Sequence, residues 1–90
     1  MRVKLAAAAN PDFGTSVVQG ILSLPARWAE VSSLRDASQV CQRYIAANEL
    51  GGGNWAGGDV EDDTGQVVAY ISYNGRVWES RAFPANEIPI

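Results

Sequence analysis

The sequence contains no histidine and, among its 90 residues, a single cysteine, Cys41. Without histidine there can be no Ser-His-Asp or Cys-His catalytic pair, no zinc-protease motif and no Cys2His2 zinc finger. One cysteine cannot form an intramolecular disulfide, and nothing else in the chain requires an oxidising compartment. The apolar runs of the sequence fall far short of the roughly 20 residues that a membrane-spanning helix needs. We therefore expect a protein that is not an enzyme and that carries neither a metal nor a cofactor.

Charge of either sign is also scarce. Seven basic and ten acidic side chains give a net charge of −3, which provides no overall attraction to nucleic acid or to an anionic membrane. The N-terminal "MRVKLAAAAN" has an apolar core of about five residues, whereas a signal peptide needs about 7–15. We expect a cytoplasmic protein that does not act at a membrane, with one domain over residues 1–81 and an extended apolar tail over residues 82–90.

One helix is predicted over about residues 34–49. Ser33 suits the N-cap, with Asp36 three residues later as in a capping box. Gly51 suits the left-handed residue that follows a helix. The apolar stripe of this helix comprises Leu34, Ala37, Cys41, Tyr44, Ile45 and Asn48.

Strands are predicted on both sides of this helix. Their expected positions are residues 2–6, 17–24 and 28–31 before it, and 55–61, 66–73 and 76–81 after it. This order predicts an α+β fold, in which the helix packs on an antiparallel sheet of the three C-terminal strands, extended by the N-terminal strands.

The last two strands are joined by Asn74-Gly75, which favours a two-residue type I′ turn. In that register Ile71 lies opposite Trp78. The face assigned to the helix then carries Val60, Val67, Ala69, Ile71 and Trp78. The second face carries Val68, Tyr70, Val77 and, if Glu61 pairs with Gln66, Trp55. A bulge at Gly65 would instead shift the first strand by one residue. The second face is too apolar to be left in water, so the N-terminal strands or another chain should cover it.

The glycine-rich "GGGNWAGG", residues 51–58, spaces its glycines like a dinucleotide-binding loop. However, it follows a helix and precedes a strand, the reverse of the order that such a loop requires. Helix termination explains it better, together with a strand whose Gly57 and Gly58 let a ring such as that of Tyr70 lie across bare backbone.

The acidic cluster within residues 59–63 resembles the start of a calcium loop. Thr64 occupies the position that requires glycine, and Tyr70 the position that requires a bidentate acid. We therefore interpret the cluster as a solvated turn, whose Asp and Thr side chains bond to the backbone.

The candidate functional surface is the C-terminal hairpin, where aromatic and basic residues are interleaved. Its members are Tyr70, Tyr73, Arg76, Val77 and Arg81. Aromatic and arginine side chains of this kind suit a protein interface, and sheets that carry them also bind nucleic acid. A purely structural role is the third interpretation, with Arg76 stacked on Tyr73 in a cation–π pair worth about 0.5–1 kcal/mol.

Residues 32–78, "SSLRDASQVCQRYIAANELGGGNWAGGDVEDDTGQVVAYISYNGRVW", resemble a set of small uncharacterised bacterial proteins. The shared features are a helix with Cys and Tyr-Ile, a "GGGNW-GG" link and a terminal "SYNGRVW". This resemblance is to a pattern and implies no activity or site residues.

Together these observations predict a non-enzymatic protein-binding or regulatory module. In one form of this prediction the chain is a homodimer joined through the second sheet face or the apolar tail. The alternative is a nucleic-acid-binding sheet domain that uses the basic and aromatic hairpin.

Overall fold

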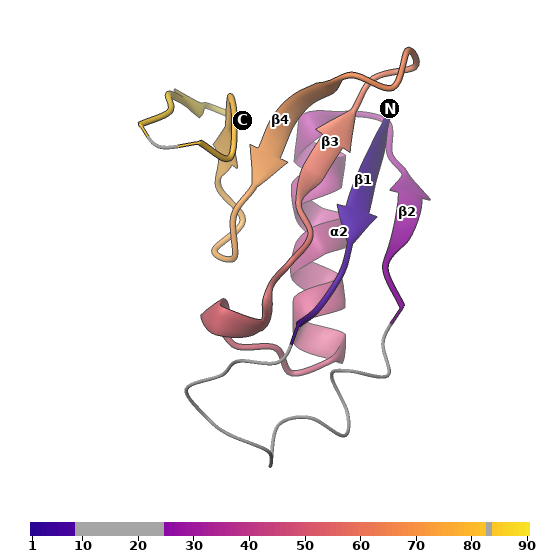
Figure 1. The fold of residues 1–90 in the computed structure, drawn as a ribbon, viewed down its shortest axis with the longest axis vertical. Coiled ribbons are helices and arrows are strands. Elements are labelled where there is room, and N and C mark those ends of the chain that lie inside the picture. The colour runs from indigo at the N-terminus through magenta and orange to yellow at the C-terminus, as the bar shows by residue number, and fades with distance from the viewer. Residues whose placement is uncertain (9–24, 83) are drawn as a thin grey trace.

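The computed structural model describes residues 1–8, 25–82 and 84–90. One helix, α2 (Leu34–Ala47), packs against one face of an antiparallel six-stranded sheet, as Figure 1 shows. The sheet order is β2-β1-β3-β4-β5-β6. The strands are β1 (Arg2–Leu5), β2 (Arg27–Glu30), β3 (Asp59–Glu61), β4 (Val67–Ile71), β5 (Val77–Trp78) and β6 (Glu87–Ile88), and a 3-10 turn, η2 (Gly52–Asn54), follows the helix. The predicted α+β class, with N-terminal strands extending the C-terminal sheet, is confirmed. The strand predicted over residues 17–24 lies outside the described residues.

Helix α2 begins as predicted. The hydroxyl of Ser33 accepts a hydrogen bond from the Asp36 amide at 3.0 Å, which satisfies one of the amides that a helix start leaves unpaired. The Asp36 carboxylate reaches back one residue further than in a standard capping box. It accepts from the Ser32 amide at 2.9 Å.

The end of α2 differs from the prediction, because Glu49 and not Gly51 adopts the left-handed conformation. Glu49 has φ 52°, whereas Gly51 has φ −90°. The Leu50 amide donates to the Ile45 carbonyl at 3.0 Å and the Glu49 amide to the Ala46 carbonyl at 3.2 Å, the two bonds of a Schellman motif. This closure buries Leu50 beside Ile45, and that apolar contact explains why a glutamate accepts a conformation that favours glycine.

The hydrophobic core lies between α2 and the sheet. Val3, Val60 and Ile71, from three adjacent strands, are completely buried. From the helix, the stripe contributes Ala37, Cys41, Tyr44 and Ile45, as predicted, while Leu34 and Asn48 lie at its margin. Burying a large aliphatic side chain contributes about 1.5–3 kcal/mol, so these contacts hold helix and sheet together.

The hairpin between β4 and β5 has a different register from the predicted one. Ile71 pairs with Val77, and Tyr70 pairs with Trp78. The Ser72 amide also donates to the Arg76 carbonyl at 2.9 Å, so the loop contains three residues, 73–75, and not two. The Gly75 amide donates to the Ser72 carbonyl at 2.9 Å, and Gly75 alone in this loop has a positive φ, at 85°. These are the features of a type I turn followed by a bulge, since a type I′ turn would also need a positive φ at Asn74.

The shift by one residue exchanges the two faces of β5. Val77 is completely buried in the core, and Trp78 lies on the opposite face beside Tyr70. The prediction that Trp78 faces the helix and Val77 faces outward is therefore wrong. Contacts within and beyond the turn favour the observed register. The Asn74 side-chain oxygen accepts from the Ser72 hydroxyl at 2.6 Å, and the buried Ser38 hydroxyl of α2 donates to the Gly75 carbonyl at 2.6 Å.

The turn between β3 and β4 is also a type I turn followed by a glycine bulge. The Gly65 amide donates to the Asp62 carbonyl at 3.0 Å, and Gly65 has φ 86°. The predicted alternative with a bulge at Gly65 is confirmed, and the pairing shifts between Val60 and Glu61. Val60 remains in the core, but Val67 is 54% exposed, so its predicted place beneath the helix is wrong.

Trp55 also lies on the helix side, and not on the Tyr70 face. Its indole ring is buried, with its centroid 6.0 Å from that of Tyr44, and its Nε1 donates to the Ile71 carbonyl at 3.0 Å. The reason is that β3 begins later than predicted. Gly58, at φ 107°, interrupts the extended backbone between Trp55 and β3, so strand alternation does not continue back to Trp55.

The end of the tail lies against its own chain. Strand β6 pairs with β5, with Ile88 opposite Val77, and the Glu79 amide donates to the Asn86 carbonyl at 2.9 Å. The Arg35 guanidinium of α2 donates to the Ile90 carbonyl. Residues 87–88 thus form the edge strand of the sheet.

Candidate functional site

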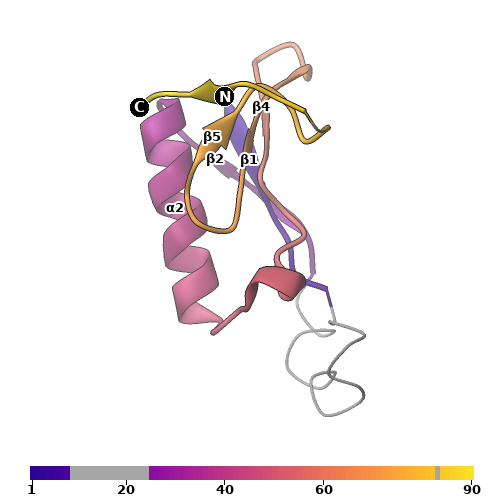
Figure 2. The ribbon, with the colours of Figure 1, turned by 90° about the vertical axis from the view of Figure 1, so that its left-hand side faces the viewer.

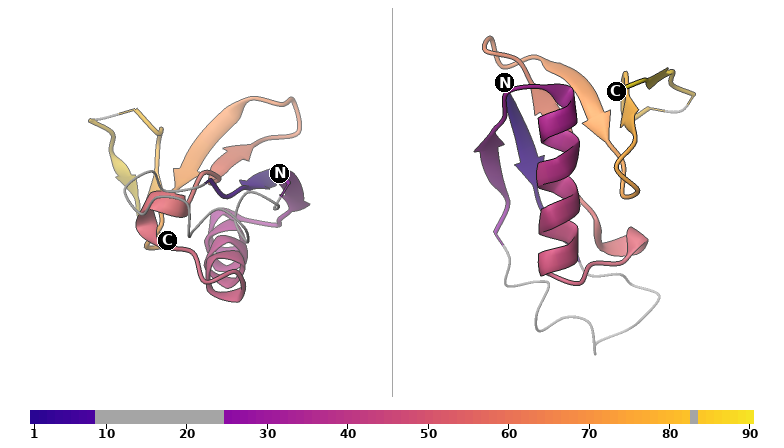
Figure 3. Two further views of the ribbon diagram at one scale, coloured as in Figure 1. Left: turned by 60° about the horizontal axis from the view of Figure 1, so that its bottom comes forward. Right: turned by 180° about the vertical axis from the view of Figure 1, so that it is seen from behind.

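The face of the sheet opposite α2 is the starting point for a site. Figure 2 shows the helix on one side of the sheet, and Figure 3 shows it again from behind. Strands β1 and β2 extend this sheet and do not cover its second face. Among the described residues, no helix or strand lies over that face, which we call the outer face.

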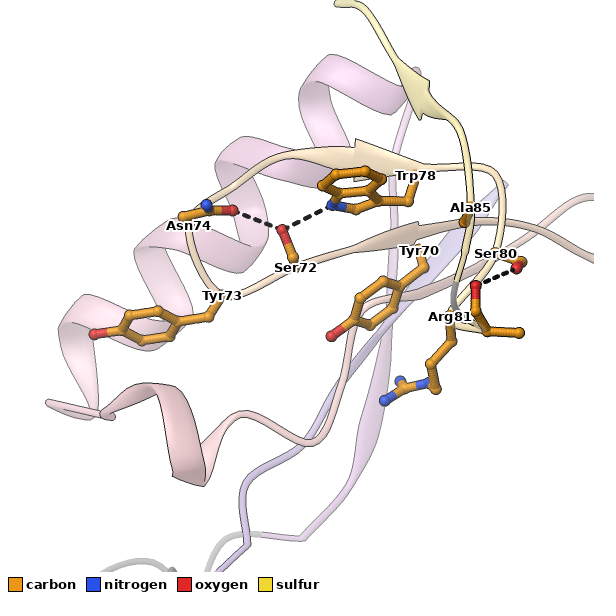
Figure 4. Close-up of a pocket in the computed structure, with 9 residues that line it drawn as sticks. Tyr70, Ser72, Tyr73, Asn74, Trp78, Ser80, Arg81 and Ala85 are labelled. Carbon is orange, nitrogen blue, oxygen red and sulfur yellow. Dashed lines mark hydrogen bonds between the residues drawn. The ribbon is translucent and has the colours of Figure 1, made fainter.

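At the β4–β5 end, the outer face contains an open groove of about 440 Å³. Its described lining is Tyr70, Ser72, Tyr73, Asn74, Trp78, Ser80, Arg81, Ala82 and Ala85. The size falls within the roughly 300–1,000 Å³ of ligand pockets in proteins. Figure 4 shows Tyr73 and Asn74 at one end of this groove and Arg81 with Ala85 at the other, with Tyr70 and Trp78 between them.

The Tyr70 ring is fixed from two sides. A Cβ on Gly58 would lie 2.9 Å from Cε1 of Tyr70, so the ring sits against bare backbone, as the sequence predicts. The guanidinium carbon of Arg81 lies 4.4 Å from the ring centroid, a cation–π contact. The predicted stacking of Arg76 on Tyr73 is replaced by this Arg81–Tyr70 pair.

Arg81 is itself held by the neighbouring strand. Its Nη2 lies 3.1 Å from the Asp59 carboxylate and donates to the Gly57 carbonyl at 3.0 Å. Because Asp59 pairs with Tyr70 across β3 and β4, the carboxylate and the ring engage the guanidinium side by side. Arg81 therefore anchors the segment after β5, which forms one end of the groove.

A short chain of hydrogen bonds fixes the groove between Trp78 and the turn. The Trp78 Nε1 donates to the Ser72 hydroxyl at 3.1 Å, and that hydroxyl donates to the Asn74 side-chain oxygen at 2.6 Å. These dashed contacts are visible in Figure 4. The indole is thus oriented by a satisfied N–H, and its ring system is the largest among the side chains that line the groove.

Tyr73 extends the groove toward the end of the helix. Its side chain is 43% exposed, and its hydroxyl donates to the Leu50 carbonyl at 3.2 Å. Gly52 lies beside the ring, with 3.7 Å between a Cβ built on it and Cδ1 of Tyr73. The glycine-rich link therefore supports an aromatic residue of the groove.

The structure brings together three of the five predicted site residues, namely Tyr70, Tyr73 and Arg81. Arg76 is exposed outside the groove lining, with its Nε 4.0 Å from the Glu87 carboxylate. Val77 is completely buried on the helix side of the sheet and cannot belong to a contact surface. Its prediction as a site residue is therefore wrong. The reason is the three-residue loop, which turns Val77 inward and Trp78 outward.

Sequence reasoning missed Trp78 as a site residue, along with the polar groups of Ser72 and Asn74. A signal was present, because Ser72 and Asn74 flank a position where their side chains can bond to each other and to the turn backbone. That signal favours a type I turn with Gly75 as the bulge, and hence the observed register.

Other reactive groups serve the fold. Cys41 is completely buried, and burial raises the pKa of its thiol to about 12. Across residues 1–8, 25–82 and 84–90, no three potential metal-ligating side chains cluster. In those same stretches, no helix has the length and apolarity to cross a membrane.

The acidic turn is also explained by its own hydrogen bonds. The Asp62 carboxylate accepts from the Thr64 hydroxyl at 2.6 Å, the Thr64 amide at 2.8 Å and the Gln66 amide at 3.1 Å. The Thr64 hydroxyl, followed by the Gln66 and Thr64 amides, lowers the pKa of Asp62 below its usual value of 3.8. As predicted, the carboxylate bonds to the turn.

Comparison of the chain with protein-family models, curated protein sequences and solved structures found no significant match. The fold and the groove therefore carry the functional argument.

Proposed function

We propose that this domain is a non-enzymatic protein-binding module and that its contact surface is the groove on the outer face. The observation that carries the proposal is the cross-strand pair of Tyr70 and Trp78, held rigidly on a sheet face that no described helix or strand covers. Tyrosine and tryptophan are among the residues that most often anchor protein interfaces, and both side chains of this pair are half-buried.

The charges around the groove favour a protein partner over nucleic acid. Arg81 lies 3.1 Å from Asp59, and Arg76 lies 4.0 Å from Glu87. A phosphate would have to compete with these carboxylates for each guanidinium, in a domain whose net charge is already −3. The basic character that the hairpin sequence suggests is thus compensated within the fold.

The groove also supplies groups that hold a ligand more readily than groups that transform one. Rings, amides and hydroxyls dominate its lining, and its charged member, Arg81, is engaged by Asp59.

We place the module in the cytoplasm, because the lone thiol of Cys41 is compatible with a reducing compartment.

Self-association is the second form of this proposal. The tail already pairs with its own β5, so the outer face is the better surface for a homodimer. Trp28, on the same face at the far edge of the sheet, is 38% exposed and would add apolar area. Light scattering on the purified chain tests this form, which predicts a mass above that of the monomer and a monomer on Trp78→Ala substitution.

The direct test is selection from a display library of random peptides. The wild-type domain should enrich related peptides, and Trp78→Ala should lose them. Trp28→Ala is the matched control, because it removes the same side chain from the other end of the outer face, where Arg2 stacks on it at 4.3 Å. If nothing is enriched, or if Trp78→Ala and Trp28→Ala have equal effects, the groove is not the binding surface.

A further inference from the structure

The aromatic rings, hydrogen-bonding groups and charge of the groove together favour one class of peptide. We infer that its partner is a proline-rich segment in the polyproline II conformation, an inference that rests on the proposed function and specifies its ligand. Such segments bind by packing their rings into grooves lined by aromatic side chains. They need no partner for a backbone N–H, since proline has none, and they lose little entropy because their extended helix is already formed.

The aromatic rings of the groove are arranged in a row. Tyr70 and Trp78 stand side by side on adjacent antiparallel strands, and Tyr73 continues the row toward the turn. Gly58 and Arg81 hold Tyr70, and Ser72 holds Trp78, so the row is formed before a ligand arrives. A rigid ligand binds best to a rigid groove, because neither partner loses conformational freedom on binding.

The hydrogen-bonding groups of the groove also suit a proline-rich segment. The side-chain nitrogen of Asn74, Nδ2, and the hydroxyl of Tyr70 have no hydrogen-bond partner among the described residues. Both residues belong to the lining of the groove. In contrast, the Asn74 side-chain oxygen already accepts from the Ser72 hydroxyl and the Arg76 amide. Both groups can donate, and the Asn74 nitrogen can only donate. A polyproline backbone presents carbonyl acceptors and no N–H donors, which matches these two groups.

The charge of the groove is compensated within the domain. Arg81 is the charged residue of the described lining, and Asp59 compensates it at 3.1 Å. An uncharged ligand therefore buries no charge on entering, whereas an acidic or basic peptide would have to give up the hydration of its charges without gaining a free counter-charge. A proline-rich peptide without charges fits the aromatic rings of the groove, its two donor groups and its compensated charge.

Calorimetric titration of the purified domain with decaproline tests this inference. A ten-residue Gly-Ser repeat of equal length serves as the control ligand. We expect saturable binding of decaproline and none of the Gly-Ser peptide. Trp78→Ala should weaken decaproline binding at least tenfold, since it removes the central ring. Tyr70→Phe keeps the ring and the fold and removes one donor, so it should weaken binding roughly 2- to 12-fold. Trp28→Ala should leave binding unchanged.

The inference is overturned if decaproline does not bind, if it binds no better than the Gly-Ser peptide, or if Trp78→Ala and Tyr70→Phe both leave its affinity unchanged. The result also separates the inference from the proposed function. If the display library yields peptides that depend on Trp78 but contain no proline, the groove is a protein-binding site with another ligand. If neither experiment detects binding, both proposals fail.

Discussion

The Asp59 carboxylate and the Tyr70 ring, paired across β3 and β4, engage the same guanidinium, that of Arg81. Asp59 lies 3.1 Å from Nη2, and the ring centroid lies 4.4 Å from the guanidinium carbon. This three-way contact joins the segment after β5 to the middle of the sheet. It therefore determines both the orientation of Tyr70 and the position of one end of the groove.

Arg81→Ala should lower the free energy of unfolding by about 0.5–2 kcal/mol. The loss combines a cation–π contact of about 0.5–1 kcal/mol with a partly exposed ion pair of up to about 1 kcal/mol. Arg76→Ala is the control, because Arg76 is more exposed and 4.0 Å from its carboxylate partner, and should cost less than about 0.5 kcal/mol. Urea unfolding of both variants measures the difference, and equal midpoints would show that the Arg81 contact does not stabilise the fold.

Two glycines with nearly equal backbone angles provide a matched pair. Gly65 (φ 86°) has nothing within 4 Å of a built Cβ, whereas a Cβ on Gly75 (φ 85°) would lie 2.4 Å from Nε2 of Gln42. Gly65→Ala should cost about 1 kcal/mol, the penalty of a left-handed alanine. Gly75→Ala should cost about 0.5–1.5 kcal/mol more, because it displaces Gln42 from its 2.9 Å hydrogen bond to the Ser38 hydroxyl.

Thermal unfolding of both glycine variants tests this difference. If Gly65→Ala is as destabilising as Gly75→Ala, the helix does not anchor the β4–β5 turn in the way described. The same result would weaken the explanation of the hairpin register, which depends on that anchor.

The pH dependence of stability should report the Asp62 turn. Its folded pKa is below its usual value of 3.8, chiefly because of the Thr64 hydroxyl, so the folded state binds a proton less readily than the unfolded state. The contribution is complete above pH 3.8 and is lost as the pH falls through the lowered folded pKa. Nuclear magnetic resonance titration should place the Asp62 midpoint below 3.8 and move it upward in Thr64→Val. An unchanged midpoint in that variant would exclude the hydroxyl as the main cause.

Cys41 should resist thiol reagents in the folded protein. Burial raises the pKa of its thiol to about 12, so very little of it is thiolate at pH 8, and the sulfur has no access to solvent. Labelling with a chromogenic disulfide should be slow in buffer and become fast in urea concentrations that unfold the domain. Rapid stoichiometric labelling of the folded protein would show that the helix–sheet core opens readily.

Local signals predicted the parts of this fold that local contacts create. The Ser33 cap and the apolar spacing up to Ile45 define α2 without help from the sheet, and they were read correctly. The sequence predicts the left-handed residue at Gly51, because glycine favours that conformation, whereas the structure places it at Glu49. Burial of Leu50, which is a tertiary effect, decided between them.

Only part of the candidate site was predicted, because tertiary contacts also help to decide the rest. Asn-Gly is compatible with loops of two or three residues, and this difference of one residue decides whether Trp78 or Val77 faces outward. The local Ser72–Asn74 bond favours the three-residue loop, and the contact between Ser38 and Gly75, 37 residues apart in the sequence, adds to it. Likewise, the neutralisation of Arg81 by Asp59 joins residues 22 apart, and no local pattern shows it.

Mapping a bound peptide onto the domain tests the central claim, that the aromatic groove on the outer face is a protein-binding surface. Isotope-labelled domain would be titrated with a peptide enriched by display, and its amide and side-chain resonances followed. The account predicts that the largest shifts fall on Tyr70, Tyr73, Asn74, Arg81 and the Trp78 indole, with little change at Trp28 or along α2. Shifts centred on α2 or on β2, with the groove resonances unmoved, would contradict it.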